Sequence, residues 1–156
     1  MTRLKTFVIA SLFVVTSCNH SDRENFSLTA KHYGGAAGVT IIYLIDENGL
    51  QVDTNCDLAN CKQATVYNRP FTKAESDNVL KVLNSLKLDT LKKSYKYQGY
   101  YNDGFLTEIK LRKGLFSSHK STFYNIYTPT ADSLNAYIDK LVAKPEFRLA
   151  TWGQTQ

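Results

Sequence analysis

The chain has no apolar run long enough to cross a membrane as a helix. Its longest, residues 7–15, has nine residues, whereas a bilayer core requires about 20. The sequence also contains no Gly-x-Ser-x-Gly elbow, no His-Glu-x-x-His motif and no phosphate-binding loop. Its three histidines, His20, His32 and His119, have no carboxylate or nucleophile at a local spacing typical of a catalytic triad. The sequence therefore indicates neither an enzyme nor a metal site or cofactor, although a hydrolase site assembled in space stays open.

The short apolar run lies between a basic start and a cysteine. Arg3 and Lys5 precede it, and Val15-Thr16-Ser17-Cys18 closes it. A charged start, a short apolar core and small residues before the end are typical of a secretory signal peptide. A short membrane helix or a buried strand is the alternative, which the polar residues 19–25 disfavour.

The closing residues Val15-Thr16-Ser17-Cys18 resemble the lipobox of bacterial lipoproteins. The resemblance implies that residues 1–17 are removed as a signal peptide and that Cys18 carries lipid such as palmitate. It also implies that residues 18–25 form a lipidated tether, leaving one domain over residues 26–156. Asn19, and not Asp, follows the cysteine, which in this family implies the outer membrane of the cell envelope. The leaflet is not implied.

The remaining cysteines and charges agree with an exported single domain. With Cys18 lipidated, Cys56 and Cys61 are an even pair, which in an exported protein favours a disulfide over free thiols or a metal site. The 139 residues after the signal suffice for one domain. They carry 17 basic and 14 acidic residues, a net charge of +3, so the charge does not indicate a nucleic-acid partner.

Residue patterns predict strands, a helix, further strands and a second helix. Thr72 and Glu75 form a capping box at the start of a predicted helix over residues 73–87. Thr128-Pro129 opens the second helix, and Lys144-Pro145 ends it. Alternating or β-branched residues predict strands over residues 26–33, 39–45, 50–53, 62–68, 105–112 and 115–127.

This order of elements predicts the fold class. Strands and helices that are segregated along the chain favour α+β, here an antiparallel sheet with two helices packed on one face. Residues 34–38, Gly-Gly-Ala-Ala-Gly, precede a strand and not a helix. We therefore interpret them as a turn or bulge, since phosphate loops precede a helix whose N-terminus binds the anion.

A tyrosine-rich segment is the candidate binding surface. Its rings, Tyr95, Tyr97, Tyr100 and Tyr101, lie near Gly99 and Gly104, which allow exposure. Flat amphipathic rings suit stacking on sugars or contact with proteins. The alternative is that these tyrosines simply cover the sheet.

The body of the chain also resembles known families in layout. With its glycine-rich first turn, Asn-Gly hairpin and two helices, it is similar to small lipoproteins of Bacteroidetes-type bacteria. The Gly-Gly-x-x-Gly turn is similar to that of emfourin-like metalloprotease inhibitors. These observations predict a non-catalytic binding module of the envelope with a protein or glycan partner, and as alternatives a proteinase inhibitor or a purely structural role.

Overall fold

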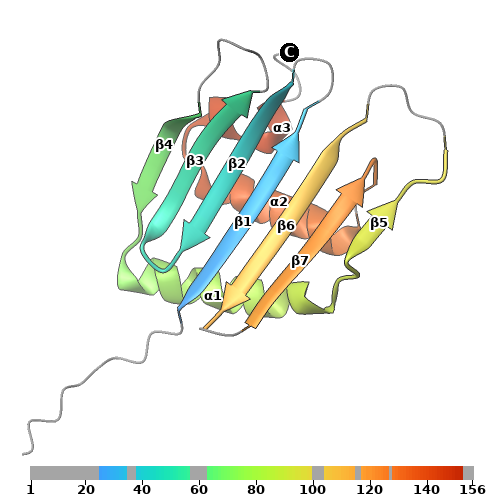
Figure 1. Ribbon diagram of the computed structural model, residues 1–156. Helices are drawn as coiled ribbons and strands as arrows, with labels where there is room; N and C mark the ends of the chain where they lie inside the picture. Colours follow the sequence, from blue (N-terminus) through green and yellow to red (C-terminus); the bar gives the residue numbers. More distant parts are fainter. Residues whose placement is uncertain are drawn as a thin grey trace, which may run out of the picture.

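The computed structural model describes residues 25–34, 38–56, 63–99, 104–114, 117–126 and 128–152. Within these ranges the chain forms a seven-stranded sheet and two 13-residue helices (Figure 1). The strands are β1 Phe26–Tyr33, β2 Val39–Asp46, β3 Gly49–Cys56, β4 Ala64–Pro70, β5 Ser94–Lys96, β6 Leu106–Lys113 and β7 Ser117–Tyr124. The helices are α1 Lys73–Ser85, α2 Pro129–Leu141 and the short α3 Leu149–Trp152, with 3-10 turns at Leu88–Thr90 and Pro145–Phe147.

The first strand in the sequence lies in the middle of the sheet. The strand order is β4-β3-β2-β1-β6-β7-β5, and β1 pairs antiparallel with both β2 and β6. The predicted α+β class with a mostly antiparallel sheet is thus confirmed. The expectation of a wholly antiparallel sheet is wrong at one edge, where β5 runs parallel to β7. With only three residues, β5 is too short to show a periodic pattern in the sequence.

One face of each central strand contributes to the core. In β1 the residues Phe26, Leu28, Ala30 and His32 are buried, and the residues between them are only partly covered. This period of two is that of a strand with one covered face. The buried side chains of the sheet belong to the same cluster as those of α1 and α2. Figure 1 shows both helices behind the sheet.

Helix α1 begins at the predicted capping box. The Thr72 side chain accepts a hydrogen bond from the Glu75 N–H, and the Glu75 carboxylate accepts one from the Thr72 N–H at 2.9 Å. Val79 and Leu83 are the buried apolar residues of the helix. The helix ends at Ser85, two residues before the predicted end, because Lys87 adopts a left-handed conformation with φ 48°.

The C-terminal segment is fastened to the body by polar contacts. The two carboxylate oxygens of Asp139 in α2 accept the N–H groups of Leu149 and Ala150 at 2.7 and 3.1 Å. The hydroxyl of Tyr43, a fully buried residue of β2, donates to the carbonyl of Phe147 at 2.8 Å. Contacts from α2 therefore hold the start of α3, and a contact from the sheet holds the 3-10 turn that precedes it.

The structure also bears on the predicted turn at residues 34–38 and on the predicted start of the strand at Phe105. The Gly34 N–H donates to the Val39 carbonyl at 3.0 Å and closes the connection between β1 and β2, while residues 35–37 lie outside the described ranges. Residue Phe105, predicted as the first strand residue, precedes β6 and is 37% exposed. None of the helices in the described ranges has the length and apolarity needed to span a membrane.

Candidate functional site

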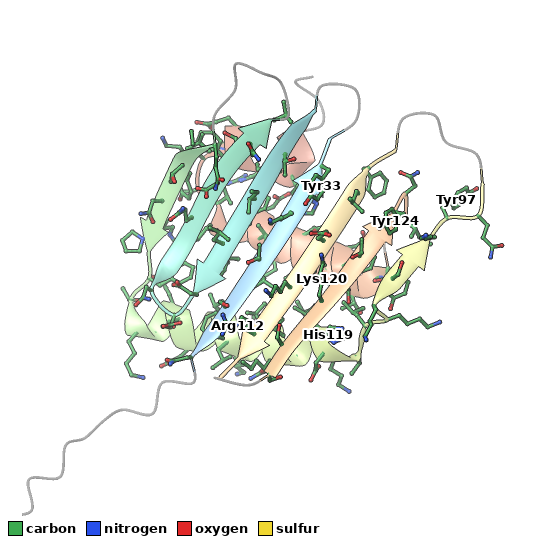
Figure 2. The ribbon with its side chains drawn as sticks, viewed as in Figure 1. Tyr33, Tyr97, Arg112, His119, Lys120 and Tyr124 are labelled. Atoms are coloured by element: carbon green, nitrogen blue, oxygen red, sulfur yellow. The ribbon has the colours of Figure 1, made fainter. Side chains whose placement is uncertain are left out.

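The predicted tyrosine surface is divided by the fold. Tyr95 lies in β5, and its ring stacks on that of Phe123 with centroids 4.9 Å apart and an interplanar angle of 3°. Phe123 is fully buried, so Tyr95 packs against the core. Tyr97 is 53% exposed and lies beyond the end of β5 (Figure 2). Tyr100 and Tyr101 lie outside the described ranges, so a binding role for this segment stays a prediction.

The cysteine predictions fall mostly on residues that are not described. Cys56 is the last residue of β3, whereas Cys61 and the lipobox cysteine Cys18 lie outside the described ranges. The disulfide and the lipid attachment therefore stay predictions. Across the described ranges, no group of three or more His, Cys, Asp or Glu residues is arranged to hold a metal ion.

His32 is a buried core residue. Its Nδ1 lies 3.0 Å from Thr107 Oγ1, and its ring meets the ring of Tyr43 edge to face at 5.9 Å. Burial lowers the pKa of His32 from 6.5 to about 4, because the charged imidazolium would lose its hydration. The ring is thus neutral at neutral pH. His119 Nε2 lies 3.2 Å from Ser121 Oγ, and His20 is outside the described ranges.

The face of the sheet opposite the helices carries a grid of polar side chains (Figure 2). Residues directly opposite one another across β1, β6 and β7 form rows, since side chains at alternate positions share a face. One row joins Lys31, Glu108 and Thr122, and the next joins Thr29, Lys110 and Lys120. Arg112 follows at the next outward position of β6. We call the following residues the basic face: Thr29, Lys31, Glu108, Lys110, Arg112, Lys120 and Thr122.

An aromatic row borders the basic face. Tyr33 of β1 lies opposite Leu106 of β6, which lies opposite Tyr124 of β7. Tyr124 is 41% exposed, and the Lys96 ammonium lies 5.2 Å from the centroid of its ring. Figure 2 shows Tyr33 and Tyr124 near the same ends of their strands. We call Tyr33, Leu106 and Tyr124 the tyrosine row.

Glu108 is the one carboxylate of the basic face, and two neighbours already bind it. The Lys120 ammonium lies 2.7 Å from Glu108 Oε1, and the Tyr33 hydroxyl donates to Oε2 at 3.5 Å. The hydrogen bond that Lys120 donates to Glu108 raises the pKa of Lys120, so this lysine stays charged at all physiological pH values. Lys31, Lys110 and Arg112 remain as further cations beside it.

The basic face is hollowed between its lysines. Thr29, Lys31, Glu108, Lys110 and Lys120 line a shallow pocket of about 210 Å³. Enclosed sites for small molecules usually have volumes of roughly 300–1,000 Å³. The hollow therefore suits one polar or charged group of a larger ligand, and not a whole enclosed ligand.

The other half of the same face, over β2 to β4, differs in charge. Asp53 is 4% exposed, and its Oδ1 accepts hydrogen bonds from Thr65 at 2.8 Å and Gln51 at 2.9 Å. Its Oδ2 accepts one from Gln63 at 3.2 Å. The pairing of β3 with β4 shifts register at Asp53, so this carboxylate satisfies donors at a β-bulge. Among the described residues, the positive charge of the face therefore lies over β1, β6 and β7, with Lys96 of β5 beside Tyr124.

The sequence predicted which residues of β6 share the outward face, but it did not predict the basic face as a surface. The alternation of β6 places Leu106, Glu108, Lys110 and Arg112 on one face, as predicted, and the buried residues of the strand confirm it. The basic face needs in addition the pairing of β6 with β1 and its register with β7. The signal available in the sequence was a lysine at an outward position of each of those strands, Lys31 and Lys120.

Comparison of the chain with models of known protein families, with curated proteins and with solved structures finds no match. The three comparisons therefore assign no family. Function is inferred from the fold and the basic face.

Proposed function

We propose that this chain is a non-catalytic binding module of the bacterial cell envelope. In this proposal lipid on Cys18 holds it at the outer membrane, and both helices cover one face of the sheet. The basic face and the tyrosine row, on the opposite face, form the surface that receives a protein or glycan partner. Exposed Lys110, Arg112, Lys120 and Tyr124 make this surface accessible.

The observation that carries the proposal is the pair Lys110 and Lys120. They are directly opposite one another in β6 and β7, and both are exposed. Like charges at such positions destabilise a sheet, and opposite charges would stabilise it. Glu108 offsets only part of this repulsion, because Lys31 and Arg112 add further positive charge. Arrangements that violate the local rules of stability are expected at functional sites, which supports a binding role.

The tether supports an envelope partner. Residues 19–25 are polar, and a chain of seven residues spans at most about 25 Å. A lipidated Cys18 would thus keep the domain, which begins at Phe26, close to the membrane surface. Partners within reach are components of the envelope.

The anchor is tested separately from the surface. Cells fed radiolabelled palmitate should label the wild-type chain and not Cys18→Ser, and the variant should leave the membrane fraction. Equal label in both chains, or an unchanged distribution of the variant, would contradict the lipid attachment.

The surface is tested by photo-crosslinking in living cells. A benzophenone amino acid at position 124, in the tyrosine row, should give a discrete crosslinked product. The same probe at Lys81, an exposed residue of α1, is the matched control and should give none. Lys110→Glu should abolish the product from position 124. Equal products from both positions would show that the surface formed by the basic face and the tyrosine row does not bind a specific partner.

Proteinase inhibition, the alternative suggested by the emfourin-like turn, stays a prediction. Three residues of that turn, 35–37, lie outside the described ranges. Titration of the chain against a panel of secreted metalloproteases tests it, and unchanged rates throughout would exclude it.

A further inference from the structure

We infer that the ligand of the basic face is an acidic polysaccharide, with its sugar rings on the tyrosine row and its carboxylates among the lysines. The inference rests on the proposed function and specifies the partner. It follows from three properties of the surface: the hydrogen-bonding capacity of the basic face, its shape, and the aromatic row at its border.

The basic face offers both positive charge and hydrogen-bond acceptors. Lys31, Lys110, Arg112 and Lys120 attract anionic oxygens, whereas the carboxylate of Glu108 can only accept hydrogen bonds. Lys120 and Tyr33 each use one site on its two oxygens, and a carboxylate has about four such sites, so Glu108 can still accept from a ligand. An ionised phosphate or carboxylate ligand has no proton to offer Glu108. A ligand that satisfies both kinds of group must carry anions and hydroxyl donors close together, and a sugar acid has this composition.

The shape of the surface indicates a linear ligand. Neighbouring strands lie about 4.8 Å apart, so the basic face on β1, β6 and β7 is a strip about 10 Å wide. On the side of β1 that holds β2, β3 and β4, the described part of the face carries no cation, and Asp53 lies there. A flat membrane of anionic lipids would contact the whole face, including this half. A single polymer chain that follows the strands would contact the cations alone.

The tyrosine row extends the strip and adds a contact that charge does not provide. Leu106 and Lys110 are four residues apart in β6, a distance of about 13 Å along the strand. A ligand that engages both rows must reach that far, so an oligomer fits better than a single sugar. Tyr33 and Tyr124 present amphipathic rings of the kind that contact carbohydrate faces at little entropic cost.

The test uses the lipidated full chain, immobilised through its C-terminus in non-ionic detergent. The probes are alginate oligosaccharides, neutral dextran oligosaccharides of matched length and polyglutamate. Alginate should bind, and dextran and polyglutamate should bind at least tenfold more weakly. Raising the salt concentration from 50 to 500 mM should weaken alginate binding, because the contacts are partly ionic.

Matched variants locate the site. Lys110→Glu and Tyr124→Ala should each weaken alginate binding at least tenfold. Lys81→Glu, on α1, and Lys140→Glu, on α2, both at exposed positions, should change it less than twofold. Denaturation curves of all four variants serve as the check that each variant remains folded.

Several outcomes would overturn the inference. Polyglutamate binding as tightly as alginate would indicate recognition of charge alone, as would Tyr124→Ala without effect. Vesicles with phosphatidylglycerol binding better than matched phosphatidylcholine vesicles, with no alginate binding, would indicate a lipid surface. If no probe binds but the crosslink at position 124 persists in cells, the glycan is excluded and the binding surface stands. Absence of the crosslinked product from position 124 would contradict the proposed function itself.

Discussion

Lys110 of β6 and Lys120 of β7 are directly opposed on the exposed face of the sheet, so two ammonium groups occupy neighbouring cross-strand positions. Of the two lysines, Lys120 alone forms an ion pair with a described residue, Glu108 at 2.7 Å. The repulsion is a property of the folded state, because the two residues approach one another only when the strands pair.

Removing this repulsion should stabilise the protein. We expect Lys110→Glu to raise the free energy of unfolding by about 0.5 kcal/mol, since cross-strand charge pairs contribute roughly 0.2–1 kcal/mol. Urea denaturation at low salt measures the gain, and Lys110→Gln should show a smaller one. The gain should shrink in 0.5 M salt. A destabilised Lys110→Glu at low salt would contradict this account of the pair.

Acid should destabilise the fold through His32. Its pKa is about 4 in the folded state and 6.5 as the ordinary value, so between these pH values the unfolded chain binds a proton that the folded chain does not. The free energy of unfolding therefore falls as the pH falls through this window, by up to about 1.4 kcal/mol per pH unit. Well above pH 6.5 both states are unprotonated, and the residue contributes no pH dependence.

The measurement is urea denaturation at several pH values between 7.5 and 4.5. His32→Gln should have a shallower dependence than wild type, whatever its stability at pH 7.5. An NMR titration of the wild-type ring gives a second reading that needs no variant. An imidazole that titrates near 6.5 in the folded protein would refute the assignment.

The capping box should contribute measurably to stability. Thr72→Ala removes the acceptor for the Glu75 N–H at the first turn of α1 and should cost about 1 kcal/mol. Ser85→Ala is a suitable comparison, because the Ser85 hydroxyl is exposed and donates only to the Val82 carbonyl at the other end of the helix. The two variants should differ clearly in their denaturation midpoints. Identical midpoints would mean that the cap contributes nothing.

Truncation of the two described tyrosines of the tyrosine-rich segment should change the free energy of unfolding by clearly different amounts. Tyr95→Ala removes a ring stacked on buried Phe123 and should cost about 2 kcal/mol, somewhat less than a fully buried aromatic residue. Tyr97→Ala, at a 53% exposed position, should change stability by less than about 0.5 kcal/mol. Thermal unfolding of both variants, with Tyr95→Phe as the conservative control, separates core from surface. Similar losses in both would place Tyr97 in the core as well.

The local elements were predictable because their signals are local. The capping box of Thr72 and Glu75, the alternation of β1 and the proline at the start of α2 each act within a few residues. The strand pairing was not predictable in this way. β1 could have paired with β2 alone, and nothing within its own sequence specifies the contact of Leu28 with Leu111 in β6.

The basic face depends on the non-local pairing of β1, β6 and β7, and for this reason residue patterns did not predict it. Lys31, Lys110 and Lys120 are separate surface lysines in the sequence, and only the registers of β1 with β6 and of β6 with β7 bring them into adjacent rows. The tyrosine-rich segment was conspicuous because its rings are close in sequence. Folding separates Tyr95 from Tyr97, because Tyr95 lies in β5 and stacks on buried Phe123, whereas Tyr97 lies beyond the end of the strand and is 53% exposed.

The central position of β1 also determines how the domain bears tension. A pull on the chain ahead of Phe26 acts along a strand that β2 and β6 flank on either side. Hydrogen bonds of an antiparallel ladder run perpendicular to the strands, so such a pull loads both ladders in shear and the bonds must rupture together. An edge strand pulled away sideways would unzip one bond at a time. A domain built in this way resists mechanical unfolding when force is applied through the chain ahead of Phe26.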